Sequence, residues 1–382
     1  MKKIDNFFKL LYFSPKNRIV QPKVVKEDVA NIIIIGMMMI GDTIMMLPAL
    51  TVLRRNFPNA KISIVCGNHV KVILENQNLV DNFFITESPW QAKKKSFNLI
   101  FNFISGIFNL NKIHYDLAID FRGDWRNIFF MNFIKSKRKV SFNYSGGEYM
   151  LTDIIEPNPE IESYSDEWLY FLNQLGCDIY DYEKKPVLHL NQKDLAYRDD
   201  FSKANDLKDY VIIGLHPGAS QRIKEWDVKK YAELILRVSS TAGKFKFLIF
   251  EGPGERNTVM QLEEILGNNE VNYLVINKKL NEYVLLISIC SIVICNDSSA
   301  AHIAGAFSVP TVEIFGNVDP RFVTPKGARI LRIVSHNLEC KPCHKSFCKL
   351  GTSACIKEIE VQEVYQPVLE ILSEINNVTY VV

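Results

Sequence analysis

The N-terminal part of the chain alternates short apolar runs with longer amphipathic stretches. Residues 31–35 (NIIII) form a β-branched run, which favours a strand buried on both faces of a parallel sheet. The stretch that follows Asp42 predicts a helix that ends before Pro58. Residues 61–67 (KISIVCG) predict the next strand. Together these segments form a βαβ unit.

The same alternation returns along the chain. Residues 116–121 predict a strand, and a helical stretch follows Gly123 as far as about Ile134. In the second half, further strands are predicted at 210–215, 246–252, 291–297 and 310–316. Helices are predicted between them at 226–240, 257–266 and 300–307. Strands that alternate with helices indicate parallel, doubly wound sheets, so we predict an α/β fold of two Rossmann-like domains with a cleft between them.

Two segments rich in Pro, Asp and Glu, 156–166 and 178–191, break this periodicity. We place the connection between the domains near residues 185–208. The predicted organisation is an N-terminal tail (1–30), a first Rossmann-like domain (31–190), a second one (208–365) and a C-terminal helix or tail (366–382).

Two further segments are apolar and basic. Residues 7–13 carry five large apolar side chains between lysines, and residues 93–113 combine three lysines with phenylalanines and isoleucines. Each is interpreted either as a helix packed on its own domain or as a surface that touches a membrane or a lipid acceptor. No apolar run reaches the ~18 residues that span a bilayer, and no signal-peptide cleavage site follows the first segment. We expect a cytoplasmic protein, peripheral on the inner face of the membrane if either segment binds lipid.

Composition and charge add little to this picture. The 382 residues are 47% hydrophobic and 23% charged, which is typical of a globular protein with two cores. The formal net charge is only +2, and no basic stripe or aromatic platform is present, so no nucleic-acid partner is predicted.

Three strand-to-helix junctions carry candidate chemistry, because open parallel sheets bind ligands at the carboxyl ends of their strands. At the first, Asp42 is either a general base or a helix N-cap. At the second, residues 215–226 (LHPGASQRIKEW) form either a phosphate-binding turn or a plain surface turn. At the third, Asp297 and Ser298 precede a helix N-terminus that suits a diphosphate, and His302 is interpreted as a helix or core histidine.

The eight cysteines fall into two groups. Cys66, Cys177, Cys290 and Cys295 stand in apolar contexts and are predicted to be small buried hydrophobic residues. The other four form a C-x2-C-x4-C-x6-C cluster and are a candidate structural zinc or iron site, with His344 as a competing ligand; surface thiols or packing are the alternatives. This cluster consists of Cys340, Cys343, Cys348 and Cys355.

Taken in order, the three junctions resemble the heptosyltransferase family, glycosyltransferase family nine. The resemblance is carried by residues 40–67, 216–235 and 297–320 and by the C-terminal cysteine segment. Together these cover most of residues 31–365 in the expected order.

The resemblance implies a GT-B fold and an inverting transfer of heptose from ADP-heptose to a lipopolysaccharide core or related glycan, with no catalytic metal. It implies that the first domain holds the glycan or glycolipid acceptor and the second the nucleotide sugar. Asp42 would be the general base, with Gly41 and Arg122 on the acceptor side. The donor would be bound by Ser220, Lys224, Glu255, Leu280, Asp297, Ser298 and Ser299.

Two positions depart from the family pattern. Met37, Met38 and Met39 replace the small hydroxyl residues that usually precede Gly-Asp, and we expect them to crowd the acceptor pocket. Ser299 stands where a glycine is usual. The alternatives are therefore a family member with a different donor sugar or a protein acceptor, or a non-catalytic scaffold that binds nucleotide sugars.

Overall fold

The computed structural model describes residues 24, 26–86, 106–343 and 345–378. These form two compact units that divide after Lys185. Most of the two lysine-rich apolar segments, at 1–18 and 93–113, lies outside the described residues; of the second segment, residues 106–110 are helical. No helix in the part of the chain that the structure describes is long and apolar enough to cross a bilayer.

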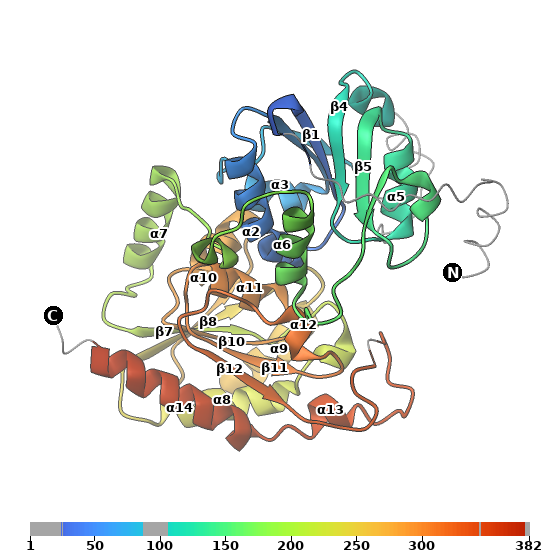
Figure 1. The fold of residues 1–382 in the computed structure, drawn as a ribbon. Helices are drawn as coiled ribbons and strands as arrows, with labels where there is room; N and C mark the ends of the chain where they lie inside the picture. The colour runs from blue at the N-terminus through green and yellow to red at the C-terminus, as the bar shows by residue number, and fades with distance from the viewer. Residues whose placement is uncertain (1–23, 25, 87–105, 344, 379–382) are drawn as a thin grey trace. The chain divides into compact units, whose positions relative to one another are not determined.

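The first unit is built around a parallel sheet of six strands in the order β3-β2-β1-β4-β5-β6 (Figure 1). Its strands are β1 (Asn31–Gly36), β2 (Lys61–Cys66), β3 (Asn82–Ile85), β4 (Tyr115–Asp120), β5 (Ser136–Phe142) and β6 (Asp153–Ile155). The described α-helices are α2 (Ile40–Asn56), α3 (Asn68–Leu74), α5 (Trp125–Asn132) and α6 (Tyr164–Gln174). Three short 3₁₀ turns complete this list at Lys26–Asp28, Glu148–Met150 and Asp181–Lys184.

The second unit repeats the same architecture. Its six parallel strands run in the order β12-β11-β10-β7-β8-β9, which is the strand order of the first sheet and of dinucleotide-binding folds. The strands are β7 (Val211–His216), β8 (Phe245–Phe250), β9 (Tyr273–Ile276), β10 (Ile292–Asn296), β11 (Thr311–Phe315) and β12 (Leu331–Ser335). The helices are α7 (Gln192–Ala204), α8 (Val228–Ser239), α9 (Arg256–Leu266), α10 (Leu280–Ile287), α11 (Ser299–Ala306), α12 (Pro320–Val323), α13 (Ala354–Lys357) and α14 (Val361–Val378), with a 3₁₀ turn at Arg222–Lys224. The predicted α/β fold is confirmed.

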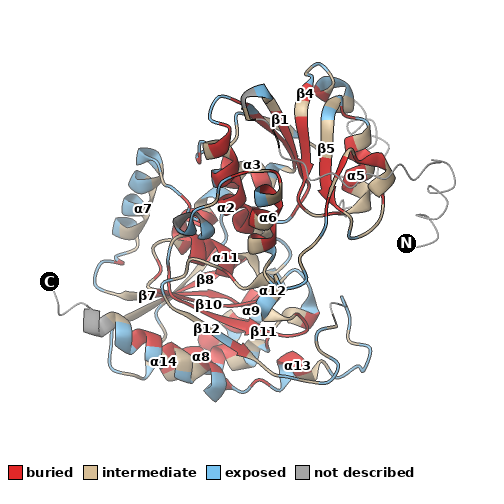
Figure 2. Cartoon of the chain, viewed as in Figure 1, coloured by how far each residue is buried: buried red, intermediate tan, exposed pale blue. Residues whose placement is uncertain are grey.

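The central strands are buried on both faces, as their apolar runs predict (Figure 2). Ile32, Ile33, Ile34 and Ile35 of β1 are all fully buried. In the second unit, α8, α9 and α14 pack their apolar sides against one face of the sheet, and α10 and α11 lie on the other. The helices therefore leave the strand ends free to position loops.

The C-terminal segment is part of the second core. Trp226 is 1% exposed, and its indole Nε1 donates a hydrogen bond of 2.8 Å to the carbonyl oxygen of Ile359. Lys230 Nζ donates to the same oxygen at 2.9 Å. α14 then packs along α8 and reaches β11 and β12 (Figure 1). The loop after β7 is thus hydrogen-bonded to the segment that leads into α14, the last described helix.

Candidate functional site

The first junction brings Asp42 and Arg122 together. α2 begins at Ile40, two residues earlier than predicted, so Met39 occupies the N-cap and Asp42 the third helical position. Asp42 Oδ2 accepts hydrogen bonds from Arg122 Nη1 (2.8 Å) and from the Met39 N–H (3.2 Å). Asp42 therefore helps to cap its helix, but from inside the first turn, and the two side chains stay about a quarter and a third exposed.

The three methionines before this junction do not share one environment. Met37 and Met38 are 2% and 0% exposed and belong to the core, whereas Met39 is 57% exposed. The expectation that all three crowd an acceptor pocket is wrong, because β1 extends to Gly36 and the chain is still buried for two residues beyond it. Only Met39 is available at the surface beside Asp42.

The second and third junctions meet at an ion pair. Lys224 Nζ lies 2.6 Å from Asp297 Oδ2, and both side chains are less than one fifth exposed. Lys224 ends the 3₁₀ turn after β7, and Asp297 follows β10 directly. Because β7 and β10 are neighbours in the sheet, their carboxyl ends place the two side chains together.

Asn296 fixes the loop that carries Lys224. This fully buried side chain donates from Nδ2 to the carbonyl oxygens of Pro217 (2.8 Å) and Gly218 (3.2 Å). Its Oδ1 accepts from the backbone N–H of Trp226 at 3.1 Å. The sequence analysis assigned no role to Asn296, although it stands directly before Asp297 at the end of an apolar strand, which is the signal that identifies it.

Glu255 closes the other side of the same loop. Its Oε2 accepts from the Gly252 N–H at 2.7 Å, and its Oε1 lies 3.5 Å from Nε2 of the buried His216. A Cβ on Gly218 would lie 2.1 Å from the Glu255 carboxyl carbon, so the carboxyl group packs directly on this glycine and a larger residue would displace it. Burial opposes ionisation of Glu255, but its hydrogen bond to His216, the His216 charge and the Gly252 N–H together lower the pKa of this carboxyl.

The remaining predicted donor residues lie at helix starts. Leu280 is the first residue of α10 and is half-buried, and Tyr283 one turn later shares a hydrogen bond of 3.0 Å with His216 Nδ1. Ser298 is the N-cap of α11 and Ser299 its first residue. Ser220 lies exposed in the loop before Lys224.

His216 links α10, through Tyr283, to Glu255, and it was not among the predicted site residues. His302 is buried on α11.

The four clustered cysteines are not gathered into a metal centre. Cys340 is exposed, Cys343 and Cys348 are half-buried and Cys355 is buried. Among the described residues, no group of three or more His, Cys, Asp or Glu side chains is arranged to hold an ion. His344 lies outside the described residues. The four cysteines Cys66, Cys177, Cys290 and Cys295 are all buried and free, as predicted.

The cysteine loop nevertheless contacts the segment that follows β11 in the second unit. The Cys343 N–H donates to the carbonyl oxygen of Asn317 (3.1 Å), and Asn317 Nδ2 donates to that of Lys345 (2.8 Å). Cys348 Sγ accepts from the Ser353 N–H at 3.4 Å, and backbone hydrogen bonds of this kind lower the pKa of the Cys348 thiol. Burial raises the pKa of Cys355.

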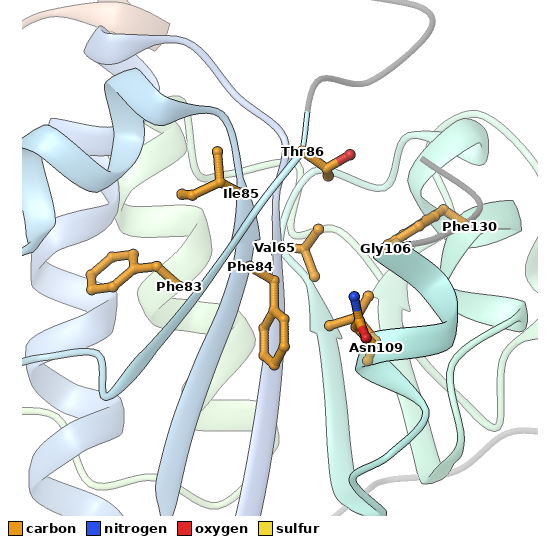
Figure 3. Close-up of a pocket in the computed structure, with 9 residues that line it drawn as sticks. Val65, Phe83, Phe84, Ile85, Thr86, Gly106, Asn109 and Phe130 are labelled. Atoms are coloured by element: carbon orange, nitrogen blue, oxygen red, sulfur yellow. The ribbon is translucent and has the colours of Figure 1, made fainter. Parts of the chain in front are cut away.

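A separate pocket of about 210 Å³ lies in the first unit, away from these residues. Figure 3 shows it between β3 and the helical residues 106–110. Its lining is mostly apolar, and none of the predicted site residues contributes to it: it consists of Val65, Phe83, Phe84, Ile85, Thr86, Gly106, Asn109, Leu110 and Phe130.

Known proteins resemble this chain along most of its length. Residues 107–354 match the family model "Glycosyltransferase family 9 (heptosyltransferase)". Lipooligosaccharide heptosyltransferase 2 from Campylobacter jejuni is 25% identical over 336 residues, covering 86% of this chain and 95% of that protein.

Two solved structures share the fold. The family 9 glycosyltransferase from Veillonella parvula superposes with a TM-score of 0.74 at 20% identity, over 92% of this chain and 99% of that one. The Escherichia coli ADP-heptose lps heptosyltransferase II gives 0.70 at 18% identity, over 90% and 99%. The fold is therefore the GT-B fold of heptosyltransferases. Since the family model matches more than half of the 382 residues, the chain belongs to glycosyltransferase family 9.

Proposed function

We propose that this glycosyltransferase moves a heptose from ADP-heptose to a lipopolysaccharide core or a related surface glycan, with inversion at the anomeric carbon. The heptosyltransferases that the chain resembles are named for lipopolysaccharide or lipooligosaccharide and, in one case, for ADP-heptose. The observation that carries the proposal is the Lys224–Asp297 pair at the strand ends, beside a glycine loop and a buried carboxylate.

The donor is proposed to bind at the second unit. Lys224 and the first amides of α11 would stabilise the charge that develops on the departing diphosphate, the task that a divalent ion performs in other transferases. Glu255 would accept hydrogen bonds from the nucleotide ribose, because its pKa is lowered and it is ionised at neutral pH. Leu280 would cover the adenine, and Ser220, Ser298 and Ser299 would line the phosphate and sugar positions.

Asp42 is proposed as the general base. Its carboxylate would take the proton of the acceptor hydroxyl as that oxygen attacks the anomeric carbon opposite the leaving diphosphate. Arg122 donates to the carboxylate at 2.8 Å, which fixes its direction, and Gly41 is proposed on the acceptor side beside it. The acceptor would be a glycolipid or glycan, so we also propose peripheral contact with the cytoplasmic face of a membrane.

The four-cysteine cluster is proposed only as a structural metal site. Backbone N–H donation to Cys348 Sγ suits a thiolate ligand, but the described residues do not assemble three ligands, so no catalytic step is assigned to a metal there.

Calorimetric binding of ADP, UDP, GDP and NAD to the purified protein without added metal tests the donor assignment. We expect ADP to bind selectively. Preference for another nucleoside diphosphate would keep a transferase but discard ADP-heptose. Absence of binding to any of the four would overturn the donor assignment.

A further inference from the structure

The backbone turn at Arg122 is hydrogen-bonded to a buried carboxyl group. Asp120, the last residue of β4, is fully buried and accepts from Asn127 Nδ2 (2.9 Å), from Ser141 Oγ (2.8 Å) and from the Arg122 backbone N–H. The backbone direction at Arg122 is therefore set by the sheet.

The same turn is clamped from the side by the loop after β5. Gly123 has φ +59°, and a Cβ there would lie 2.7 Å from the Tyr144 ring, so the ring packs directly on the glycine. Ser145 Oγ donates to the Gly123 carbonyl oxygen at 2.7 Å and accepts from the Trp125 N–H at 2.7 Å. Because Gly123 directly follows Arg122, the Tyr144 ring packs against the backbone next to the arginine.

Helix α6 fixes Tyr144 in turn. The Tyr144 hydroxyl donates a hydrogen bond to Glu167 Oε1, and Glu167 is only 7% exposed. Tyr164 lies one turn earlier on α6, where the charges of Arg122 and Asp42 act on its phenol. α6 also packs against α2, which carries Asp42 (Figure 1). Helix α6 therefore packs against the helix that carries Asp42 and brings Tyr164 within range of the charges of both Asp42 and Arg122.

We propose that Glu167 is a positioning residue, which acts through Tyr144 and the Gly123 turn to keep Arg122 on Asp42. The proposal rests on the assignment of Asp42 as the general base. It adds two residues, Tyr144 and Glu167, to which neither the sequence nor the family comparison assigns a role. Both are proposed to act through Arg122, so neither is assigned as a catalytic residue.

Glu167 is a buried acid, and its burial has a desolvation cost. Burial raises the pKa of Glu167 to about 7. The titratable and charged groups on the elements packed around it include Tyr144, Tyr164, Arg122 and Asp42. An apolar residue would avoid this desolvation cost but could not accept a hydrogen bond from the Tyr144 hydroxyl. This favours a positioning role over simple packing.

The test compares Y144F, E167A, the double variant Y144F/E167A and the conservative variant E167Q in transfer assays at saturating donor. We expect Y144F and E167A each to lower kcat by about 10–100-fold with the donor KM unchanged, because a small displacement at a reacting centre has effects of that order. The double variant should lose no more than the larger single loss, since both changes break one interaction. E167Q should retain most of the activity, because an amide oxygen still accepts from Tyr144.

Rescue by the conservative variant separates positioning from general stability. If the hydrogen bond to Tyr144 positions Arg122, E167Q should keep a kcat that E167A loses, with the donor KM unchanged in both variants. Y180F is the matched control, since Tyr180 of the same unit lies over Arg55, and it should change neither kcat nor KM.

The outcomes separate the two hypotheses. If Asp42→Asn retains transfer, the proposed base is wrong. If Asp42→Asn is inactive but folded Y144F keeps the wild-type kcat, the positioning role alone is overturned. Should E167A fail to fold, Y144F and E167Q, checked by circular dichroism and thermal melting, decide the question in the same way.

Discussion

Lys224 Nζ and Asp297 Oδ2 lie 2.6 Å apart although 73 residues separate them in the chain. The two side chains come from adjacent strand ends and neutralise each other in a setting where each is mostly buried. A bound diphosphate would compete with Asp297 for the ammonium group. The ion pair therefore positions the Lys224 ammonium group at the proposed phosphate site before the donor binds.

Replacing Lys224 with alanine should weaken donor binding. Loss of a hydrogen bond from a charged group costs about 1.5–3 kcal/mol, so the Kd for ADP should rise about 10–100-fold in calorimetry. Lys229→Ala, on the exposed start of α8, is the control and should leave the Kd unchanged. Equal affinity of Lys224→Ala and wild type for ADP would exclude the lysine from the phosphate site.

The Asp42→Asn variant should bind ADP normally but transfer sugar about 10²–10⁴-fold more slowly, the usual range for loss of a general base. An asparagine oxygen can still accept from Arg122, so the local geometry is retained. Single-turnover rates together with calorimetry check both statements. Near-normal transfer would assign the base elsewhere.

Glu255 can be tested against the ribose itself. Wild-type protein should bind ADP about tenfold more tightly than 2′,3′-dideoxy-ADP, because the carboxylate accepts from the ribose hydroxyls. In Glu255→Gln this preference should shrink, and in Glu264→Gln, a change at an exposed part of the same helix, it should persist. If Glu255→Gln keeps the full preference, another group holds the ribose.

The unfolding free energy should depend on pH through the titration of Glu167. Its pKa is 4.5 when unfolded and about 7 when folded, so the folded protein retains a proton that the unfolded chain releases between these values. Its contribution to stability is therefore most favourable at low pH and falls as the pH rises from about 4.5 to 7. Relative to Glu167→Gln, wild-type protein should lose about 1–3 kcal/mol of unfolding free energy across this window in urea titrations. A constant difference would show that Glu167 titrates as an exposed acid does.

The cysteine cluster predicts stoichiometric zinc or iron in freshly purified protein, measured by elemental analysis. The replacement Cys343→Ser should abolish the metal, whereas Cys290→Ser, at a buried cysteine just before β10, should retain it. If metal-free wild-type protein keeps its thermal stability, the cluster is not a structural metal site.

The central strands could be predicted from the sequence because burial on both faces leaves a long apolar run, as at residues 31–35. β5 was missed because its first half, Ser136–Arg138, is polar and only partly buried. The edge strands β3, β6, β9 and β12 are short, at three to five residues, so they lack a clear run. The helix after β1 begins two residues earlier than predicted, because Met39 at its N-cap is not a residue type that signals a helix start.

The candidate site divides in a similar way. Asp42, Lys224 and Asp297 could be proposed from the sequence because they lie in the segments that follow strands, where the sheet topology determines the neighbours. The pairing of Asp42 with Arg122 joins residues 80 positions apart, and only the sheet order brings them together. Asn296 and His216 act by hydrogen bonds to loops, which no spacing in the sequence encodes.

The hydrogen bond from Trp226 to Ile359 has a consequence for synthesis. The loop that carries Lys224 depends on a segment 133 residues further along the chain. On the ribosome, domains form from the N-terminus onward, so the first sheet can be complete while the indole of Trp226 still lacks its acceptor. An unfinished chain that ends before Val361 also lacks α14. Such a chain would carry the Asp42–Arg122 pair with an unbraced nucleotide loop, so competence to bind the donor should arise last, only when translation is nearly finished.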